Sequence, residues 1–200
     1  MQKSSNVLEK SFKTTGEMMY TIRVLNLRDL LSVHLVYNSL SANSKQYYNS
    51  IIYGKPKKPL WILAQIALVI SHTPFVKIIR HVYPKYLYFI VGAFDEQNHL
   101  LGFAHCVLHG YSSNGKLIGR LGIAIKDEFQ GKGLGTRLME QLIQLAKNNS
   151  VNIIFLEVLS TNEKGLALYK KCGFRTVNVY RDSASVNGKI HNIYKMELYL

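Results

Sequence analysis

The most constraining feature of this sequence is a glycine-rich stretch between a predicted strand and a predicted helix. The stretch is Gln130-Gly131-Lys132-Gly133-Leu134-Gly135, and the strand before it covers residues 116–125. Apolar residues after it recur at spacings of three and four, the pattern of an amphipathic helix: Leu134, Leu138, Met139, Leu142 and Leu145. Glycine lets a ligand approach the backbone, and the unpaired N–H groups at a helix start favour an anion, above all a phosphate. The order of strand, glycine loop and helix therefore predicts a phosphate site, with a simple tight turn as the alternative.

Two other phosphate loops can be compared with this stretch directly. The P-loop pattern Gly-x-x-x-x-Gly-Lys-Ser/Thr occurs nowhere in the chain. The dinucleotide pattern Gly-x-Gly-x-x-Gly also fails, because its last glycine would fall on Thr136 or on Leu138. Glu157 lies about the right distance downstream for a ribose contact, but the glycine spacing is wrong for this class of site.

The remaining pattern, Gln-x-x-Gly-x-Gly between a strand and a helix, resembles the acetyl-CoA motif of the GNAT superfamily of N-acetyltransferases. Further matches lie downstream at Glu157, Asn162 and the run Leu168-Tyr169-Lys170-Lys171-Cys172-Gly173-Phe174. Asn162 follows Glu157 by five residues and Tyr169 follows Asn162 by seven, a spacing similar to that of the ribosomal-protein N-terminal acetyltransferases. The resemblance covers residues 100–181 well and the first half of the chain poorly.

The hydrophobic patterns predict an α/β fold with a mixed, mostly antiparallel central sheet and helices on both faces. We expect strands at residues 19–25, 86–94, 100–108, 116–125, 152–158, 175–180 and 190–198. We expect helices at residues 27–40, from Ser41 or Asn43 to 52, at 134–148, and from Asn162 to Gly173. The resemblance implies an acyl-CoA N-acyltransferase fold, in which strands 116–125 and 152–158 run parallel and splay apart around the pantetheine arm of the cofactor.

Domain organisation follows from length and local composition. Two hundred residues fit one domain, which we place at 18–200 after a polar, flexible N-terminal arm at 1–17. An extended acceptor-side helical segment is expected at about 41–85, where all four prolines lie. Its apolar run, residues 60–70, is too short to span a bilayer. We predict a buried helix there, with a lid, a weak membrane contact or a dimer face as alternatives.

The resemblance assigns a set of cofactor contacts. Backbone amides of the glycine loop would hold the diphosphate of acetyl-CoA, and backbone groups of the strand before it would pair with the pantetheine arm. Asn162 would cap its helix and also contact that arm. The implied cofactor-binding residues are Ile123, Ala124, Ile125, Gln130, Gly131, Lys132, Gly133, Leu134, Gly135, Thr136 and Asn162.

Two residues are candidates for the chemistry. Glu157, near the end of a buried strand, can accept a proton from the substrate ammonium, directly or through a water. Its alternative is a structural ion pair or an exposed strand end. By resemblance the hydroxyl of Tyr169 protonates the leaving thiolate, and the alternative for Tyr169 is a tyrosine that anchors its helix in the core.

Composition restricts partners and compartment. The formal net charge is +13, which attracts anions such as coenzyme A, but the basic residues are scattered, so no nucleic-acid partner is expected. Cys106 and Cys172 match no metal or redox spacing and indicate a reduced, cytoplasmic protein. His105 and His109 have no third ligand at a suitable spacing, so no metal is expected.

Together these features predict an N-acetyltransferase that uses acetyl-CoA as cosubstrate and acts by direct attack in a ternary complex. The acceptor is a primary amine of unknown identity, with a small amine or amino sugar slightly preferred over a protein N-terminus. The alternative is a non-catalytic acyl-CoA-binding sensor. The segment between the first strand and Tyr86 is long and apolar for this family. Acceptor specificity usually lies in that segment, so a peptide acceptor cannot simply be carried over.

Overall fold

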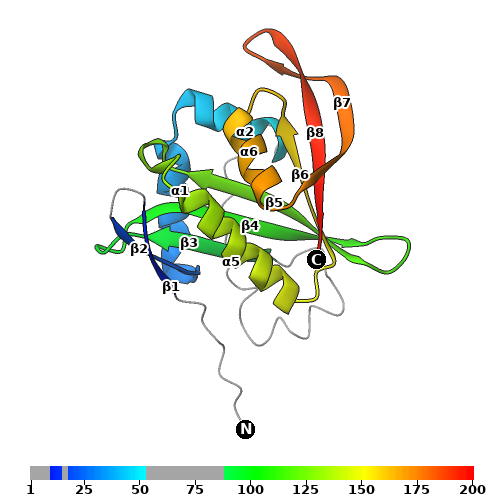
Figure 1. Cartoon of the computed structure of the whole chain (residues 1–200). Helices are drawn as coiled ribbons and strands as arrows, with labels where there is room; N and C mark the ends of the chain where they lie inside the picture. Colours follow the sequence, from blue (N-terminus) through cyan, green and yellow to red (C-terminus); the bar gives the residue numbers. More distant parts are fainter. Residues whose placement is uncertain (1–9, 15–17, 53–87) are drawn as a thin grey trace.

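In a computed structural model of the chain, residues 10–14, 18–52 and 88–200 are described (Figure 1). Eight strands form one sheet: β1 (Lys10–Lys13), β2 (Met19–Val24), β3 (Tyr88–Phe94), β4 (Leu100–Tyr111), β5 (Leu117–Ile125), β6 (Ile153–Leu159), β7 (Arg175–Val186) and β8 (Lys189–Tyr199). The helices are α1 (Leu30–Ser39), α2 (Ala42–Ile52), α5 (Leu134–Asn148) and α6 (Glu163–Lys171), with short 3-10 turns η1 (Leu27–Asp29) and η3 (Asp127–Phe129).

The strands are ordered β1-β2-β3-β4-β5-β6-β8-β7 across the sheet. Every neighbouring pair is antiparallel except β5 and β6, which are parallel because the crossover through α5 returns the chain to the same end of the sheet. The predicted fold class, a mixed and mostly antiparallel sheet with helices on both faces, is confirmed.

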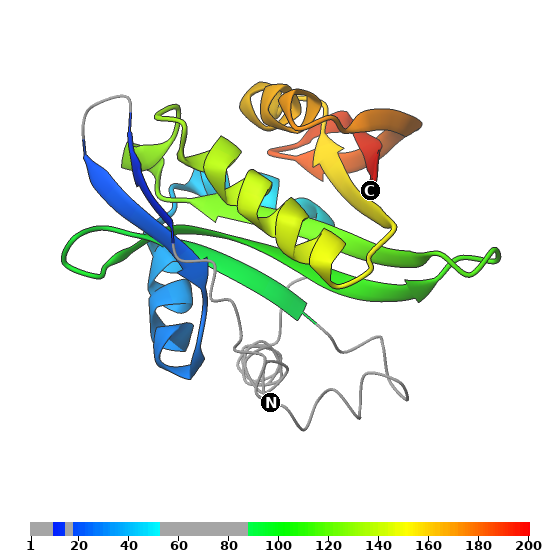
Figure 2. The same ribbon diagram turned by 60° about the horizontal axis from the view of Figure 1, so that its bottom comes forward.

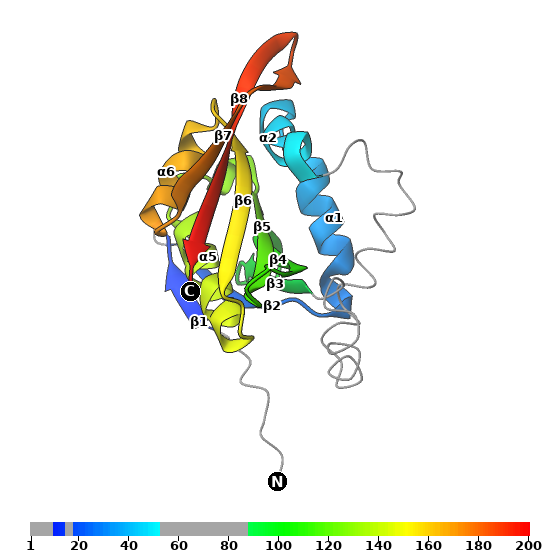
Figure 3. The same ribbon diagram turned by 90° about the vertical axis from the view of Figure 1, so that its right-hand side faces the viewer.

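The helices divide between the two faces of the sheet. Figure 3 shows α5 and α6 on one side and α1 and α2 on the other. The α5 face buries the larger cluster, which contains Leu138, Met139 and Leu142 of α5 together with Ile154 and Leu156 of β6. A smaller cluster joins α1 to the opposite face through Val33, Val36, Leu40, Ile90, Phe94, Leu100, Phe103 and Ala124. Viewed nearly edge-on, α5 lies across the middle of the sheet (Figure 2).

Part of the expected N-terminal arm is ordered in the sheet. Residues 10–13 form β1, which pairs with β2 from Lys10 opposite Ile22 to Lys13 opposite Met19. Phe12 stacks on Tyr20 with ring centroids 5.7 Å apart, so one aromatic contact holds an otherwise polar strand. The prediction of a flexible arm is therefore wrong for residues 10–13, and residues 1–9 and 15–17 lie outside the described part.

The C-terminal hairpin is longer than predicted. β7 continues to Val186 and β8 begins at Lys189, so a two-residue turn joins the strands that were predicted to end at 180 and to begin at 190. Asn187 and Gly188 have φ of 51° and 75°, the left-handed values that a tight hairpin turn needs. An Asn-Gly pair between alternating residues was the sequence signal for this turn.

The apolar run at 60–70 and most of the expected helical segment at 41–85 lie outside the described residues. Within the described part, α2 confirms the predicted helix after Ser41, whose hydroxyl accepts a hydrogen bond from the N–H of Ser44 at 3.2 Å. None of the helices described here has both the length and the apolar character that a membrane span requires.

Candidate active site at the β5–β6 fork

The glycine loop leads from β5 through η3 into the first turn of α5. Gly131 and Gly133 have φ of 75° and 86°, and Gly133 is the N-cap of α5 without a side-chain cap. A Cβ placed on either glycine would meet no heavy atom within 4 Å. Both glycines thus border open space at the start of α5, next to the helix amides that have no intrahelical partner.

The loop opens beside a divergence of two strands. β5 and β6 pair over three positions only: Ile118 with Ile153, Gly119 with Ile154, and Arg120 with Phe155. Beyond these pairs β5 continues along β4, whereas β6 continues along β8. We call the diverging segments, 121–125 and 156–159, the β5–β6 fork. The fork is the splay that the resemblance implied, and it widens toward the end where the glycine loop begins.

One edge of the fork carries backbone groups that no neighbouring strand pairs. The N–H of Lys126 donates to the carbonyl of Leu101 at 3.0 Å, so this residue belongs to a hydrogen-bonded pair of the β4–β5 ladder. Such pairs alternate along antiparallel strands, so Ala124 also bonds toward β4, while Ile123 and Ile125 point their backbone groups into the fork. Two of the three predicted pantetheine contacts therefore have the required orientation, and Ala124 directs its backbone to β4.

The side chain of Gln130 links the glycine loop to the segments around it. Its side-chain amide donates to the carbonyl of Ile125 at 3.1 Å, to Asp127 at 2.9 Å and to the hydroxyl of Ser44 at 3.2 Å. The side chain thus ties the loop to the end of β5 and to α2. Of the other loop residues predicted to bind the cofactor, Gly131, Lys132 and Gly133 are exposed, whereas the Leu134 side chain is buried. The ammonium of Lys132 lies 5.5 Å from the ring centroid of Phe129.

Helix α2 also belongs to this site, although it was not among the predicted site elements. Asp127 accepts hydrogen bonds from the hydroxyl of Ser44 and from the N–H of Ser41, the latter at 2.7 Å. At the other branch of the fork, the Tyr47 hydroxyl donates to the carbonyl of Thr161 at 3.3 Å. Helix α2 therefore connects the ends of β5 and β6 on the face opposite α6. No local pattern indicates these contacts, because more than 80 residues separate Ser44 from Asp127.

The environment of Asp127 stabilises its charged form. Its hydrogen bond from the Ser44 hydroxyl, together with those from Ser41 and Gln130, lowers the pKa of this carboxyl below its usual value despite partial burial. The contact between α2 and the loop is therefore strongest with Asp127 ionised.

Glu157 lies on β6, two residues beyond the last parallel pair. Its carboxylate accepts a hydrogen bond from the guanidinium of Arg120 at 2.8 Å, and the side chains are 26% and 22% exposed respectively. Arg120 was not among the predicted site residues. The sequence signal for Arg120 as a site residue was its charge within the otherwise apolar strand Leu117–Ile125.

Tyr169 and Asn162 belong to α6. Burial of the Tyr169 side chain raises the pKa of its phenol to about 12, so the hydroxyl stays protonated at neutral pH. The ring packs edge-on against Phe174 with centroids 6.1 Å apart. Asn162 is the N-cap, and its side chain accepts a hydrogen bond from the N–H of Gly165 at 3.0 Å. The predicted capping role of Asn162 is confirmed.

The two candidate catalytic side chains lie on opposite faces of the fork. Leu156 and Val158 are buried in the α5-side cluster, so Glu157 between them projects toward the α1 and α2 side. Tyr169 belongs to the α5-side cluster. Glu157 and Tyr169 are thus placed on opposite sides of the sheet.

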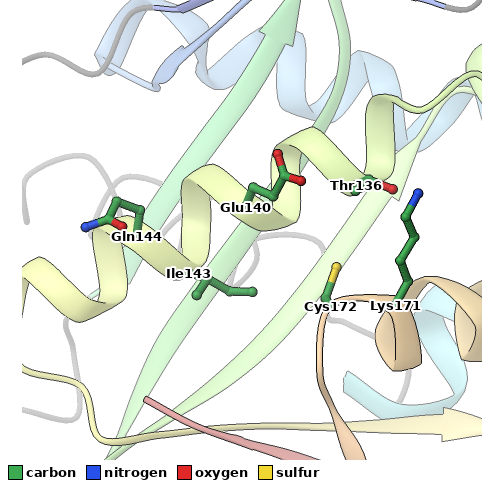
Figure 4. A pocket seen from close by; sticks show the side chains of 6 residues that line it. All are labelled: Thr136, Glu140, Ile143, Gln144, Lys171 and Cys172. Carbon is green, nitrogen blue, oxygen red and sulfur yellow. The ribbon is translucent and has the colours of Figure 1, made fainter.

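A groove between α5 and α6 adjoins the loop. It has a volume of about 280 Å³ and is lined by Thr136, Glu140, Ile143, Gln144, Lys171 and Cys172 (Figure 4). The Lys171 side chain extends from α6 toward Thr136 in the first turn of α5. Gly135, one residue earlier, lies where a Cβ would be 3.2 Å from both Ile125 and Leu168, so this glycine permits the close approach of α5, β5 and α6.

The histidines of β4 are not arranged as a metal site. His105 is buried, and its desolvation, with a smaller contribution from the positive charge of Arg120, lowers its pKa to about 4. His109 is exposed and touches the edge of Phe155, with ring centroids 5.4 Å apart. Within residues 10–14, 18–52 and 88–200, no three His, Cys, Asp or Glu side chains are grouped to hold a metal ion.

Comparison with known proteins supports an acetyltransferase assignment. The sequence matches the model of the Acetyltransferase (GNAT) family over residues 57–174. It is 30% identical to the N-alpha-acetyltransferase RimI of Mycobacterium tuberculosis over 107 residues. This alignment covers 46% of this chain and 66% of that protein. The matched stretch therefore spans just under two thirds of the mycobacterial relative.

Two further similarities cover more of the chain. An alignment of 162 residues, 24% identical, relates it to the L-methionine sulfoximine/L-methionine sulfone acetyltransferase of Pseudomonas paraeruginosa and covers 78% of this chain and 81% of that protein. The fold is similar to the crystal structure of a GNAT superfamily phosphinothricin acetyltransferase from Sinorhizobium meliloti in complex with AcCoA. That comparison has a TM-score of 0.66, 17% identity, and coverage of 90% of this chain and 88% of the other.

Proposed function

Because the chain belongs to the acetyltransferase (GNAT) family, we propose that it transfers the acetyl group of acetyl-CoA to a primary amine by direct attack in a ternary complex. The observation that carries this proposal is the β5–β6 fork. Its free strand edge and the uncapped start of α5 lie at the same end of the sheet. One ligand with a diphosphate and an extended, amide-containing arm fits both.

The chain offers separate contacts for the two parts of acetyl-CoA. Backbone amides of the loop and of the first turn of α5 would hold the diphosphate: Gly131, Lys132, Gly133, Leu134, Gly135 and Thr136. Ile123 and Ile125 would pair with the pantetheine arm as a neighbouring strand would. Gln130 supports the loop indirectly, and Asn162 remains a proposed contact from the β6 branch of the fork.

The proposed reaction places each proton on a named group. Glu157 accepts a proton from the acceptor ammonium, which leaves a neutral amine. The amine nitrogen then forms a bond to the acetyl carbon while the carbon–sulfur bond breaks, and the nitrogen loses its second proton to water as the amide forms. The N–H of Ile125 would stabilise the negative charge that develops on the carbonyl oxygen, a type of contact commonly worth about 3 kcal/mol. Tyr169 donates its phenolic proton to the thiolate and regains one from solvent.

The arrangement of the two faces supports these roles. Glu157 is open to the α1 and α2 side, at 26% exposure, so an acceptor can approach it from solvent. Tyr169 lies in the α5-side core, and its phenol is protonated at neutral pH, so it carries the proton that the thiolate needs. Amine and sulfur would therefore meet proton-transfer groups on opposite sides of the fork.

The acceptor is proposed as a small amine or amino sugar in preference to a protein N-terminus. The relatives' names indicate different acceptors, ribosomal protein alanine in one case and methionine sulfoximine in another, so family membership leaves the acceptor open. Both cysteines are free thiols, which fits the proposed cytoplasmic location.

The test is release of the coenzyme A thiol from acetyl-CoA across a panel of primary amines. We expect turnover with at least one amine and a fall in kcat of about 10²-fold for Tyr169→Phe, with a smaller change in KM. Tyr111→Phe is the matched control, because Tyr111 is 62% exposed at the far end of β4 and should leave kcat unchanged. Glu157→Gln should lower kcat at neutral pH and recover as rising pH deprotonates the amine.

The same assay addresses the sensor alternative. Tight binding of coenzyme A without thiol release for any amine would favour a sensor over an enzyme. If Tyr169→Phe reacts as fast as Tyr111→Phe, Tyr169 contributes only to packing and is not the proton donor.

A further inference from the structure

The ion pair between Arg120 and Glu157 lies at the narrow end of the β5–β6 fork. Arg120 is the last residue of β5 that pairs with β6, and Glu157 is two residues beyond its partner Phe155. Their side chains meet at 2.8 Å on the face opposite α5 and α6, and both reach solvent. The proposed base is thus accompanied by a fixed cation at the point where the acceptor amine must arrive.

The surroundings add further positive charge. The guanidinium of Arg120 lies 6.0 Å, and the ammonium of Lys195 5.4 Å, from the ring centroid of Phe155. Lys195 is also the β8 partner of Glu157, although its ammonium pairs with Glu197 at 2.9 Å. His105 on the same face is neutral at physiological pH, because its pKa is about 4. Among the described residues, the charged side chains around Glu157 are therefore Arg120, Lys195 and Glu197, and Arg120 is the cation in contact with Glu157.

This arrangement distinguishes between classes of amine. A simple ammonium, such as that of a polyamine or a peptide N-terminus, brings a positive charge to Glu157 and meets Arg120 as a like charge. An α-amino acid brings a carboxylate with it, about 3 Å from the ammonium nitrogen by standard bond lengths. Such a zwitterion can replace the Arg120–Glu157 contact with two pairs, ammonium with Glu157 and carboxylate with the planar guanidinium.

We propose that the acceptor is a free α-amino acid, whose carboxylate is bound by Arg120 while Glu157 receives the proton of its amine. This inference rests on the proposed acetyl transfer and narrows its acceptor class. The product is the N-acetyl amino acid, formed with release of the coenzyme A thiol. Arg120 is then a substrate-binding residue that selects for a carboxylate beside the reacting amine.

The experiment compares each L-amino acid with its own C-terminal amide in the thiol-release assay, with putrescine, glucosamine and an alanine-initiated peptide as further acceptors. The best free amino acid should exceed its amide at least tenfold in kcat/KM, mainly through KM. This preference cannot come from amine basicity, because loss of the carboxylate makes the amide's amine less basic and thus more often neutral.

Variants of Arg120 test whether this side chain causes the preference for a free amino acid over its amide. Arg120→Met should remove the discrimination between acid and amide, and Arg120→Lys should restore part of it by returning the charge without the bidentate geometry. Lys116→Met removes one exposed cation just before β5 and should keep the full preference. Thermal unfolding of each variant, measured alone and with coenzyme A, shows whether the fold and the cofactor site persist.

The outcomes separate this inference from the proposed function. Efficient turnover of amides, a peptide, an amino sugar or a polyamine with no advantage for the free acid would overturn the inference and leave acetyl transfer standing. A preference for the acid that survives in Arg120→Met would also overturn it. Absence of turnover with every acceptor would instead contradict the proposed function.

Discussion

Substitution of Gly133 tests whether the glycine loop binds coenzyme A. Gly133 has a φ of 86°, a left-handed value that costs a residue with a Cβ about 1–2 kcal/mol. For a chain of this length, 1 kcal/mol corresponds to roughly 2–4 °C in Tm, so Gly133→Ala should lower Tm by about 2–8 °C. Gly115→Ala is the matched control, because Gly115 has a φ of 75°, also has no heavy atom within 4 Å, and lies in the turn before β5.

Only the Gly133 variants should lose cofactor affinity. The Cβ at position 133 would enter open space at the start of α5, where the diphosphate is proposed to bind. We expect the Kd for coenzyme A to rise at least tenfold, equivalent to about 1.4 kcal/mol. Gly133→Asn separates bulk from strain, since asparagine tolerates the left-handed conformation better than alanine. It should retain more stability than Gly133→Ala and bind coenzyme A as poorly.

Isothermal titration calorimetry gives the Kd directly, and the rise in Tm with added coenzyme A gives an independent measure through mass action. Equal coenzyme A affinity in Gly133→Ala, Gly133→Asn and Gly115→Ala would refute a diphosphate site at this loop. Equal weakening in all three would show that the effect comes from general destabilisation.

Two further predictions concern the supports of the fork. Gly165→Ala should lower the Tm, because the new Cβ would lie 2.6–2.9 Å from side-chain atoms of Asn162. This clash should outweigh the preference of alanine for a helix, which is about 1 kcal/mol. In an Asn162→Ser background, where those atoms are absent, Gly165→Ala should instead raise the Tm. Asp127 has a lowered pKa in the folded chain, so its contribution to stability is fully present above the ordinary Asp pKa and is lost as pH falls through the lowered value. Thermal unfolding across acidic pH should show a smaller loss of stability in Asp127→Asn than in the wild type.

The parts of the site that sequence predicts well are those determined by local periodicity. The α5 helix begins at Leu134 and ends at Asn148, as the apolar spacing predicted, and the Asn162 cap is confirmed by its bond to Gly165. β1 was missed for the opposite reason. Its four residues include two lysines and a serine, and its place in the sheet depends on Phe12 reaching Tyr20 in the next strand.

Contacts between distant segments account for the rest. The fork arises because β5 follows β4 while β6 follows β8, and no residue of either strand marks the position where their pairing stops. The same divergence makes Arg120 informative. In the strand of a closed sheet its charge would need a partner simply to offset burial, but at the fork the pair with Glu157 is partly exposed to solvent, where the acceptor is proposed to bind. A cation in an apolar strand was visible in the sequence, and only the end of the parallel pairing shows why it lies beside the proposed base.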